Sequence, residues 1–488
     1  MFSFRTTPIQ QQPDLILKGG KIGVLCNQTA WHPETGEYIF ETYAKKGNLK
    51  RVFIPEHGLF GELQDQVKLD ETSVYANLLP KPSSARKEPA DENQVTSRKE
   101  TSEEHLATSR KEIAEEHLAT SRKETAEKHQ ATSRQQTAEE HQATSRQKTA
   151  DKNSANTSNG EIEFVSLYGN SEESLYASVG KLEDLDALII ELQDVGCRYY
   201  TYISTVFNLF KVLKNAEIGL SVYIIDRANP AGRQVEGTML RAGYRSFIGV
   251  EGIPHRHGLT FGELAYHLYN EINAKFPLHI ISYKASQGNK DLLPWSIPPS
   301  PNFPGLFTAH FYSGQCLWEG TNVSEGRGTT RPFELFGAPF MESLAGYNST
   351  NGFENWNDPK HPMHDEGVFI RWMKFIPVFH KYKDECCFGF QLLLNPNMQY
   401  HALAHNLRIM RFINDNCPGF EFRPGKYEAG NDKTAIELLL GDKELIDYVK
   451  GQGDWKDIKE HIKVEEQKWI RKTKKDLLYE DEQLYRIK

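Results

Sequence analysis

Residues 187–214, ALIIELQDVGCRYYTYISTVFNLFKVLK, contain three patterns in succession. The apolar run at 187–190 is typical of a buried strand, and a polar cluster at 191–196 follows it directly. Residues 201–214 then have helical character. A strand, a polar cluster and a helix in this order are typical of one unit of a parallel sheet, so the stretch indicates an α/β fold.

Four further apolar runs in the first half of the chain repeat this arrangement. They span residues 21–26, 52–54, 164–167 and 220–225, and each ends in polar residues. Helical stretches at 40–46 and 172–179 lie between them. Continuous apolar runs that alternate with helices predict a parallel sheet covered on both faces. Ligands of such sheets bind beyond the carboxyl ends of the strands, where the polar clusters are expected to converge.

The composition is that of an ordinary globular protein. The chain has 488 residues, of which 38% are hydrophobic and 25% charged, with a formal net charge of −8. This length predicts two or three domains, and the negative charge argues against a nucleic-acid partner. The six cysteines have no CxxC spacing, so we expect neither a metal site nor a disulfide framework. No cofactor is predicted, and the oligomeric state is left open.

No targeting or membrane-spanning segment is expected. Residues 1–18 contain one arginine and no long apolar stretch, so they do not resemble a secretory signal. No run of about 18 apolar residues occurs, which argues against a membrane span. We therefore expect a cytoplasmic protein, or a periplasmic one if translation starts further upstream.

A repeat interrupts the sheet pattern. Residues 96–155 hold five copies of a twelve-residue unit that begins as TSRKETSEEHLA. Twelve residues at about 100° each leave about 120° over after whole turns, so equivalent positions form no continuous apolar face. We expect residues 73–160 to be an exposed, low-complexity insert between the second and third strands of the sheet.

The sharpest motif is PEHGLFGE at residues 55–62. Two glycines allow a tight turn after a buried strand, which would bring Glu56 and His57 to a ligand. Burial would raise the pKa of Glu56 and suit it to general acid catalysis. The alternative is a structural loop glutamate beside a capping histidine.

The cluster after the fourth strand is nearly as informative. Glu191, Gln193 and Asp194 lie where the strand ends, and Arg198 and Tyr200 lie before the next helix. Flat, hydroxyl-tipped tyrosine rings suit sugar binding, although these tyrosines can equally pack in the core. Asp194 can equally be the N-cap of the helix.

The next polar segments add further candidates. DRANPAG at 226–232 contributes Arg227, which can clamp a substrate carboxylate, and Asn229. Glu236 and Glu251 each precede a glycine. His257 and His255 lie in a loop before the helix at 261–272, for which Thr260 and Glu263 predict a capping box. The alternative for Arg227 is a structural pair with a neighbouring acid.

The second half of the chain has a different pattern. Residues 279–283 and apolar runs within 369–394 predict strands, and helices are expected at 401–414, 434–440 and 457–482. Residues 276–488 are therefore expected to form an α+β domain that closes over the first domain, residues 1–275. The glycine-rich segment NVSEGRGTTRPFE at 322–334 resembles a binding loop and provides Asn322, Glu325 and Arg327.

Several common catalytic motifs are missing from the sequence. No GxGxxG opens a helix after the first strand, and no GxxxxGK[ST] or HExxH occurs. No GxSxG is present, which argues against a serine hydrolase.

The motifs together resemble those of the exo-β-N-acetylmuramidases of glycoside hydrolase family 171. The similar segments include KIGVLCNQTAW at 21–31, FIPEHGLFGELQDQ at 53–66, ELQDVGCRYYTYIST at 191–205 and TNVSEGRGTTRPFELFGAP at 321–339. The resemblance implies a Rossmann-like N-terminal domain, a smaller C-terminal domain and an active site between them. It also implies release of N-acetylmuramic acid from the non-reducing end of peptidoglycan fragments. The long insert and the lack of an export signal depart from the family pattern.

The resemblance and the residues lead to one set of candidates. Catalytic carboxylates are sought among Glu56, Glu191, Asp194, Glu236 and Glu251, with Glu56 as the first choice. Substrate contacts are sought among Asn27, His57, Gln193, Arg198, Tyr200, Arg227, Asn229, His257, Asn322, Glu325 and Arg327. Glycoside hydrolysis generally needs two carboxyl groups, and the arginines can recognise the lactyl carboxylate of muramic acid.

Two other function classes stay open at this point. One is a metal-dependent hydrolase that uses His57, Asp194, Asp226, His255 and His257. The other is a protein that binds cell-wall fragments without turnover.

Overall fold

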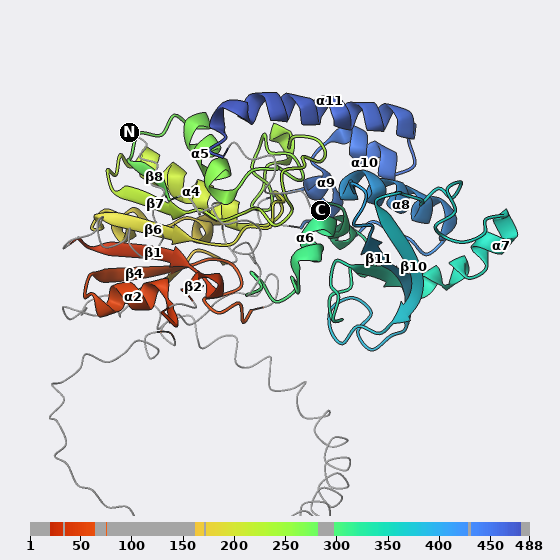
Figure 1. Ribbon diagram of the computed structural model, residues 1–488, viewed down its shortest axis with the longest axis horizontal. Helices are drawn as coiled ribbons and strands as arrows, with labels where there is room; N and C mark the ends of the chain where they lie inside the picture. Colours follow the sequence, from red (N-terminus) through yellow and green to blue (C-terminus); the bar gives the residue numbers. More distant parts are fainter. Residues whose placement is uncertain are drawn as a thin grey trace, which may run out of the picture. The chain divides into compact units, whose positions relative to one another are not determined.

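The sheet predicted from the first half of the chain is present and has six parallel strands. The computed structural model describes residues 20–32, 35–63, 75, 162–169, 172–281, 297–427 and 431–479. The strands are β1 (Ile22–Cys26), β4 (Leu49–Ile54), β5 (Glu163–Ser166), β6 (Ala187–Glu191), β7 (Ser221–Ile225) and β8 (Leu278–Ile281). Their spatial order is β5-β4-β1-β6-β7-β8 (Figure 1). Counted along the chain this is 3-2-1-4-5-6, the order of a Rossmann-like sheet.

Alternate residues of the central strands point to opposite faces of the sheet, and each face has its own core. Leu25 of β1 belongs to a core that includes α4 (Tyr202–Asn215) and α5 (Phe261–Glu271). Val24, its neighbour, belongs to a second core that includes α2 (Ile39–Lys45). All five residues of β1 and of β6 are buried. Helices therefore cover both faces, as the continuous apolar runs predict.

The helix α5 begins where its sequence predicts. Thr260 accepts a hydrogen bond from the backbone N–H of Glu263 at 3.1 Å, and the Glu263 carboxylate accepts one from the N–H of Thr260 at 2.9 Å. This is the expected capping box. It fixes the segment that follows the polar residues of β7.

The second half of the chain forms a three-stranded antiparallel sheet with helices. The strands are β9 (Leu335–Ala338), β10 (Val368–Phe375) and β11 (Cys387–Leu394), in the order β10-β11-β9. The helices include α6 (Leu306–Gln315), α7 (Tyr347–Asn351), α8 (Ala402–Asn416), α9 (Ala435–Leu440), α10 (Lys443–Val449) and α11 (Trp455–Thr473). The long helix α11 runs from this part of the molecule to α5 (Figure 1). None of the helices within the described ranges combines the length and apolar character that crossing a bilayer requires.

Four expectations for the fold need correction. The helix expected at 457–482 is α11, which ends at Thr473. The strand expected at 279–283 in the second domain is β8, which lies at the edge of the first sheet. The helix expected at 172–179 is replaced by two 3₁₀ turns, Glu172–Leu175 and Val179–Lys181. Tyr75, placed in the exposed insert, is only 4% exposed and packs beside Phe60 and Phe164. The other residues of the predicted insert at 73–160, with its repeats at 96–155, lie outside the described residues.

Candidate functional site

A cavity of about 430 Å³ lies beyond the carboxyl ends of β4, β5 and β6. Four of the residues predicted from the sequence line it: Glu56, His57, Tyr200 and Arg327. Its wall also contains residues of the second half of the chain, such as Asn302, Glu319 and Tyr427. The volume is within the usual range for small-molecule sites.

Glu56 and His57 reach the cavity because the chain turns sharply after β4. His57 has a φ of +73° and Gly58 a φ of +88°, so two successive residues adopt left-handed backbone. The turn is held by a contact of 3.1 Å between His57 Nδ1 and the carbonyl of Leu63. Glu56 is 5% exposed and accepts a hydrogen bond of 2.6 Å from Thr201 Oγ1 at the start of α4.

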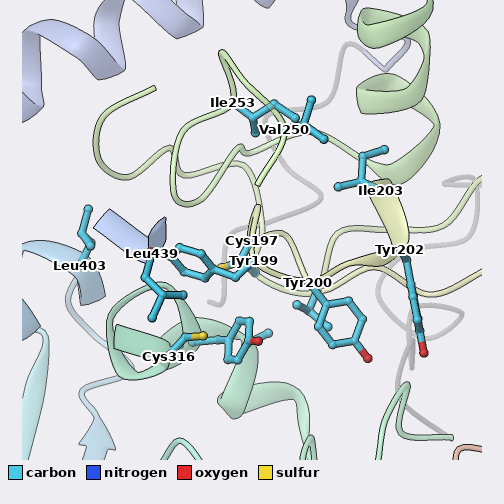
Figure 2. Close-up of a cluster of buried hydrophobic side chains, with 14 of the residues drawn as sticks. Cys197, Tyr199, Tyr200, Tyr202, Ile203, Val250, Ile253, Cys316, Leu403 and Leu439 are labelled. Carbon is cyan, nitrogen blue, oxygen red and sulfur yellow. The ribbon is translucent and has the colours of Figure 1, made fainter. Parts of the chain in front are cut away.

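Aromatic rings form one wall of the cavity. Tyr200 makes edge contacts with Tyr202, Phe303 and Tyr312, at centroid distances of 4.8, 5.8 and 6.2 Å. Figure 2 shows Tyr199 beside Cys316 and Leu439, which come from the second half of the chain. Tyr199, Tyr200 and Tyr202 are therefore all core residues, and the first two also line the cavity, whereas Tyr202 does not.

The second carboxylate on the cavity wall is Glu319, which was not predicted from the sequence. Glu319 accepts hydrogen bonds from the Arg327 guanidinium at 2.7 Å and from the Tyr427 hydroxyl at 3.0 Å. It lies in a 3₁₀ turn, Cys316–Gly320, just before the glycine-rich segment. That position was the available signal, but its partners are 8 and 108 residues away in the sequence.

The glycine-rich segment is held by a buried charge cluster. Glu325 is fully buried and lies 2.9 Å from Lys381, 3.1 Å from His380 and 3.2 Å from Arg327. Burial alone would raise the pKa of Glu325, but Lys381 and the other cations outweigh it and hold this pKa far below its usual range. Glu325 thus anchors Arg327 on the cavity wall. The other candidate of this segment, Asn322, pairs with the backbone of Gly419 and Glu421.

Glu191, the acid at the end of β6, is held in buried ion pairs. Glu191 is fully buried and forms ion pairs with Arg227 and, at 3.0 Å, with His32. Burial alone would raise the pKa of Glu191, but Arg227 and His32 outweigh it and leave the pKa below its usual range. Arg227 also donates to the carbonyl of Thr29 at 2.9 Å. Arg227 therefore forms a structural pair with a neighbouring acid, which was the alternative to a substrate clamp. Neither Arg227 nor Glu191 lines the cavity.

Other candidates near the strand ends hold loops together. Asp194 accepts hydrogen bonds from the backbone N–H of Gly196 at 2.7 Å and lies 3.1 Å from His257 Nε2. It does not cap α4, whose N-cap is Thr201. Asn229 donates to the carbonyl of Leu259 at 2.8 Å. Gln193 donates to the carbonyls of Asp194 and Ala228, and Asn27 caps a 3₁₀ turn and donates to Tyr202.

Arg198, Glu236 and Glu251 are separated from the cavity wall. Arg198 is fully buried and donates to the carbonyls of Thr238, Ile253, Leu439 and Leu440, so it braces the two halves of the chain. Burial lowers the pKa of this guanidinium to about 10. Glu236 is also fully buried, with Arg256 at 2.7 Å and Ser313 at 2.6 Å. Glu251 is exposed in a turn.

Of the residues of the metal-hydrolase alternative, Asp194 and His257 contact each other at 3.1 Å, and the others have separate partners. Asp226 accepts hydrogen bonds from Thr260 and Tyr479, both at 2.7 Å, while His255 contacts Arg198 at 3.1 Å. Within the described ranges, the acidic and histidine side chains close enough to share an ion are Asp442, Glu444 and His461. That group lies at the start of α10 and on α11, and it shares no residue with the cavity wall.

Two family models match this chain, one in each half. Residues 109–306 match the family model for the N-terminal part of the exo-β-N-acetylmuramidase NamZ, and residues 310–479 match the model for its C-terminal part. A curated relative, the peptidoglycan β-N-acetylmuramidase NamZ of Bacillus subtilis strain 168, is 36% identical over 282 residues. The match covers 56% of this chain and 64% of that relative, which is less than two thirds of its length.

Solved structures support the fold. Two proteins of the DUF1343 family from Bacteroides fragilis NCTC 9343 are each 21% identical to this chain, and each comparison covers 97% of both chains. Their TM-scores are 0.63 and 0.56. The C-terminal model includes Glu319 and Arg327, the two models together include the aromatic wall, and Glu56 lies outside both matched ranges. The chain therefore belongs to the family of exo-β-N-acetylmuramidases represented by NamZ.

Proposed function

We propose that this protein is a glycoside hydrolase that releases N-acetylmuramic acid from the non-reducing end of peptidoglycan fragments. The observation that carries the proposal is the presence of two carboxylates, Glu56 and Glu319, on the wall of one cavity in a chain of this family. Glycosidases generally use such a pair, one to protonate the leaving oxygen and one to stabilise or attack the sugar.

The contacts of the two carboxyl groups suggest different roles. Glu56 has a neutral hydroxyl partner, Thr201, and a hydroxyl can bond to either protonation state of a carboxyl group. Glu319 is bonded to the Arg327 guanidinium, which stabilises a carboxylate. We assign Glu56 as the general acid and Glu319 as the carboxylate that faces the developing positive charge.

The aromatic wall provides the rest of the site. A ring of the sugar can pack on Tyr200 and Phe333, which line the same cavity. Arg327 lies with its guanidinium carbon 5.0 Å from the centre of the Phe333 ring, a cation–π contact that helps to hold the ring in place. This arrangement orients a sugar between the two carboxylates with few mobile parts.

The test is a pair of chromogenic sugars. Purified protein is incubated with 4-nitrophenyl β-N-acetylmuraminide and with the corresponding N-acetylglucosaminide, each with and without a chelator. We expect hydrolysis of the muraminide, with no loss in the presence of chelator. Binding of the muraminide without release of nitrophenol would identify a wall-fragment binding protein instead, and loss of activity with chelator would favour a metal-dependent hydrolase.

A further inference from the structure

Positive side chains outnumber negative ones on the cavity wall. Its described residues include three cations, Lys211, Arg245 and Arg327, and two acids, Glu56 and Glu319. A cavity that is lined in this way attracts an anionic ligand. The three cations differ in what else they contact, and that difference identifies which one can serve a ligand.

Arg327 and Lys211 are engaged within the protein. Arg327 pairs with Glu319 at 2.7 Å and with Glu325 at 3.2 Å. The ammonium of Lys211 lies 4.7 Å from the centre of the Phe207 ring, a cation–π arrangement. Both cations therefore already have electrostatic partners.

Arg245 differs from them. Arg245 is exposed, and within the described part of the chain it forms no ion pair with a carboxylate. Its backbone is fixed, because its N–H donates to the carbonyl of Ala242 at 3.3 Å, and Ser246 and Gly249 form a bridge just after it. The next residue but one, Phe247, packs beside Tyr168 with centroids 5.7 Å apart. A fixed base with an exposed guanidinium at a cavity suits recognition of a carboxylate.

The geometry points to Arg245 as the residue that reads the lactyl carboxylate of N-acetylmuramic acid. This inference rests on the proposed function, because that carboxylate is what distinguishes N-acetylmuramic acid from N-acetylglucosamine. The planar guanidinium can bind both carboxylate oxygens at once, which an ammonium cannot do with the same geometry. Arg198 and Arg227, which the sequence offered for this task, are held by backbone carbonyls and by Glu191.

The experiment compares Arg245→Gln and Arg245→Lys with the unchanged protein on the two nitrophenyl sugars. For Arg245→Gln we expect kcat/KM on the muraminide to fall about tenfold or more, the size of one lost charge-assisted hydrogen bond. The fall should lie mainly in KM, since the lactyl group is remote from the reacting bond. Hydrolysis of the glucosaminide should not change, and Arg245→Lys should retain part of the selectivity. Arg371→Gln, on the exposed face of β10, is the matched control and should match the unchanged protein.

Two results would overturn the assignment. One is equal loss on both sugars, which a merely structural role would give. The other is loss of selectivity in Lys211→Gln but not in Arg245→Gln. If the unchanged protein hydrolyses neither sugar, the proposed function fails, and titration with free N-acetylmuramic acid and N-acetylglucosamine then tests Arg245 by itself. Weaker binding of the first sugar alone by Arg245→Gln supports the assignment, and unchanged binding contradicts it.

Discussion

The two carboxylates of the cavity have different neighbours: Thr201 Oγ1 lies 2.6 Å from Glu56, and the Arg327 guanidinium lies 2.7 Å from Glu319. A hydroxyl adds no charge, whereas a guanidinium favours an ionised partner. At the scale of single residues, this difference supports the division of work between an acid and a carboxylate.

Replacement of Glu56 by Gln should remove the proton donor and keep the shape of the side chain. General acid catalysis contributes about 10²–10⁴ in rate, so turnover of natural disaccharides should fall by about this factor. The nitrophenyl substrate needs less protonation and should be affected less. Kinetics of both substrates measure this, with Glu251→Gln as the control, because Glu251 is exposed and off the cavity wall. Equal loss on both substrates, with weaker binding, would make Glu56 a sugar-binding residue.

The buried carboxyl of Asp226 should influence stability in the acid range. Burial raises its pKa to about 6, although Thr260 and Tyr479 donate hydrogen bonds to it. The folded state then binds a proton more tightly than the unfolded state, so its contribution to the free energy of unfolding is present below about pH 4 and falls as pH rises to about 6. Asp226→Asn does not ionise, so the stability difference between variant and unchanged protein should shift towards the variant by about 3 kcal/mol over this range. Urea unfolding at pH 4 and pH 7 measures the shift. A difference that is independent of pH would contradict the prediction.

At the scale of elements, the strand ends hold two kinds of acid. Glu56 follows β4 and faces the cavity, whereas Glu191 ends β6 and forms buried pairs with Arg227 and His32. A buried charge without a partner is costly, so the central strands place their acids in ion pairs. The carboxyl edge of the sheet therefore borders the cavity on one side and holds buried ion pairs on the other.

The pair between Glu191 and Arg227 should be essential for stability. Arg227→Met leaves a fully buried carboxylate with only His32 as its described charged neighbour, and this should cost about 3–5 kcal/mol. The double variant Glu191→Gln, Arg227→Met should recover much of that loss, because no charge is then left unpaired. Urea unfolding of the two single variants and the double variant measures the coupling. Additive losses would mean that the pair has little interaction energy.

The elements that could be predicted from sequence are those with a strong local pattern. The strands β1, β6 and β7 and the helices α4 and α5 lie within two residues of their predicted positions, because apolar runs and a capping box define them locally. The 3₁₀ turns at 172–179 and the position of β8 in the first sheet could not be predicted, because neither depends on the local sequence pattern alone. The site divides in the same way. His57 and Glu56 follow from a local motif, but Glu319 is recognised only once Tyr427 is beside it.

At the scale of the whole molecule, contacts from α11 and the residues after it join the two halves of the chain. Trp469 donates from its ring N–H to the carbonyl of His257 at 2.9 Å, and Tyr479 reaches Asp226. Asp476 lies 2.7 Å from His267 of α5. The cavity wall also draws on both halves of the chain. Its shape therefore depends on these remote contacts.

Trp469→Ala should destabilise both halves together. Trp469 is fully buried, and removal of a large buried side chain costs about 3–5 kcal/mol. Its neighbour Ile470 is 52% exposed, so Ile470→Ala should change stability by no more than about 0.5 kcal/mol. Thermal melting followed by circular dichroism compares the two variants. Similar melting temperatures for both would show that α11 is not held through Trp469.

The position of Arg198 has a consequence for synthesis of the chain on the ribosome. Its guanidinium is bonded to carbonyls that follow it by 241 and 242 residues. At about 5–20 residues per second, those carbonyls are made about 12–50 s after Arg198. Until then a positive group that is fully buried in the finished protein has to remain hydrated. The packing around Arg198 is therefore expected to be completed only after residues 439 and 440 have been made.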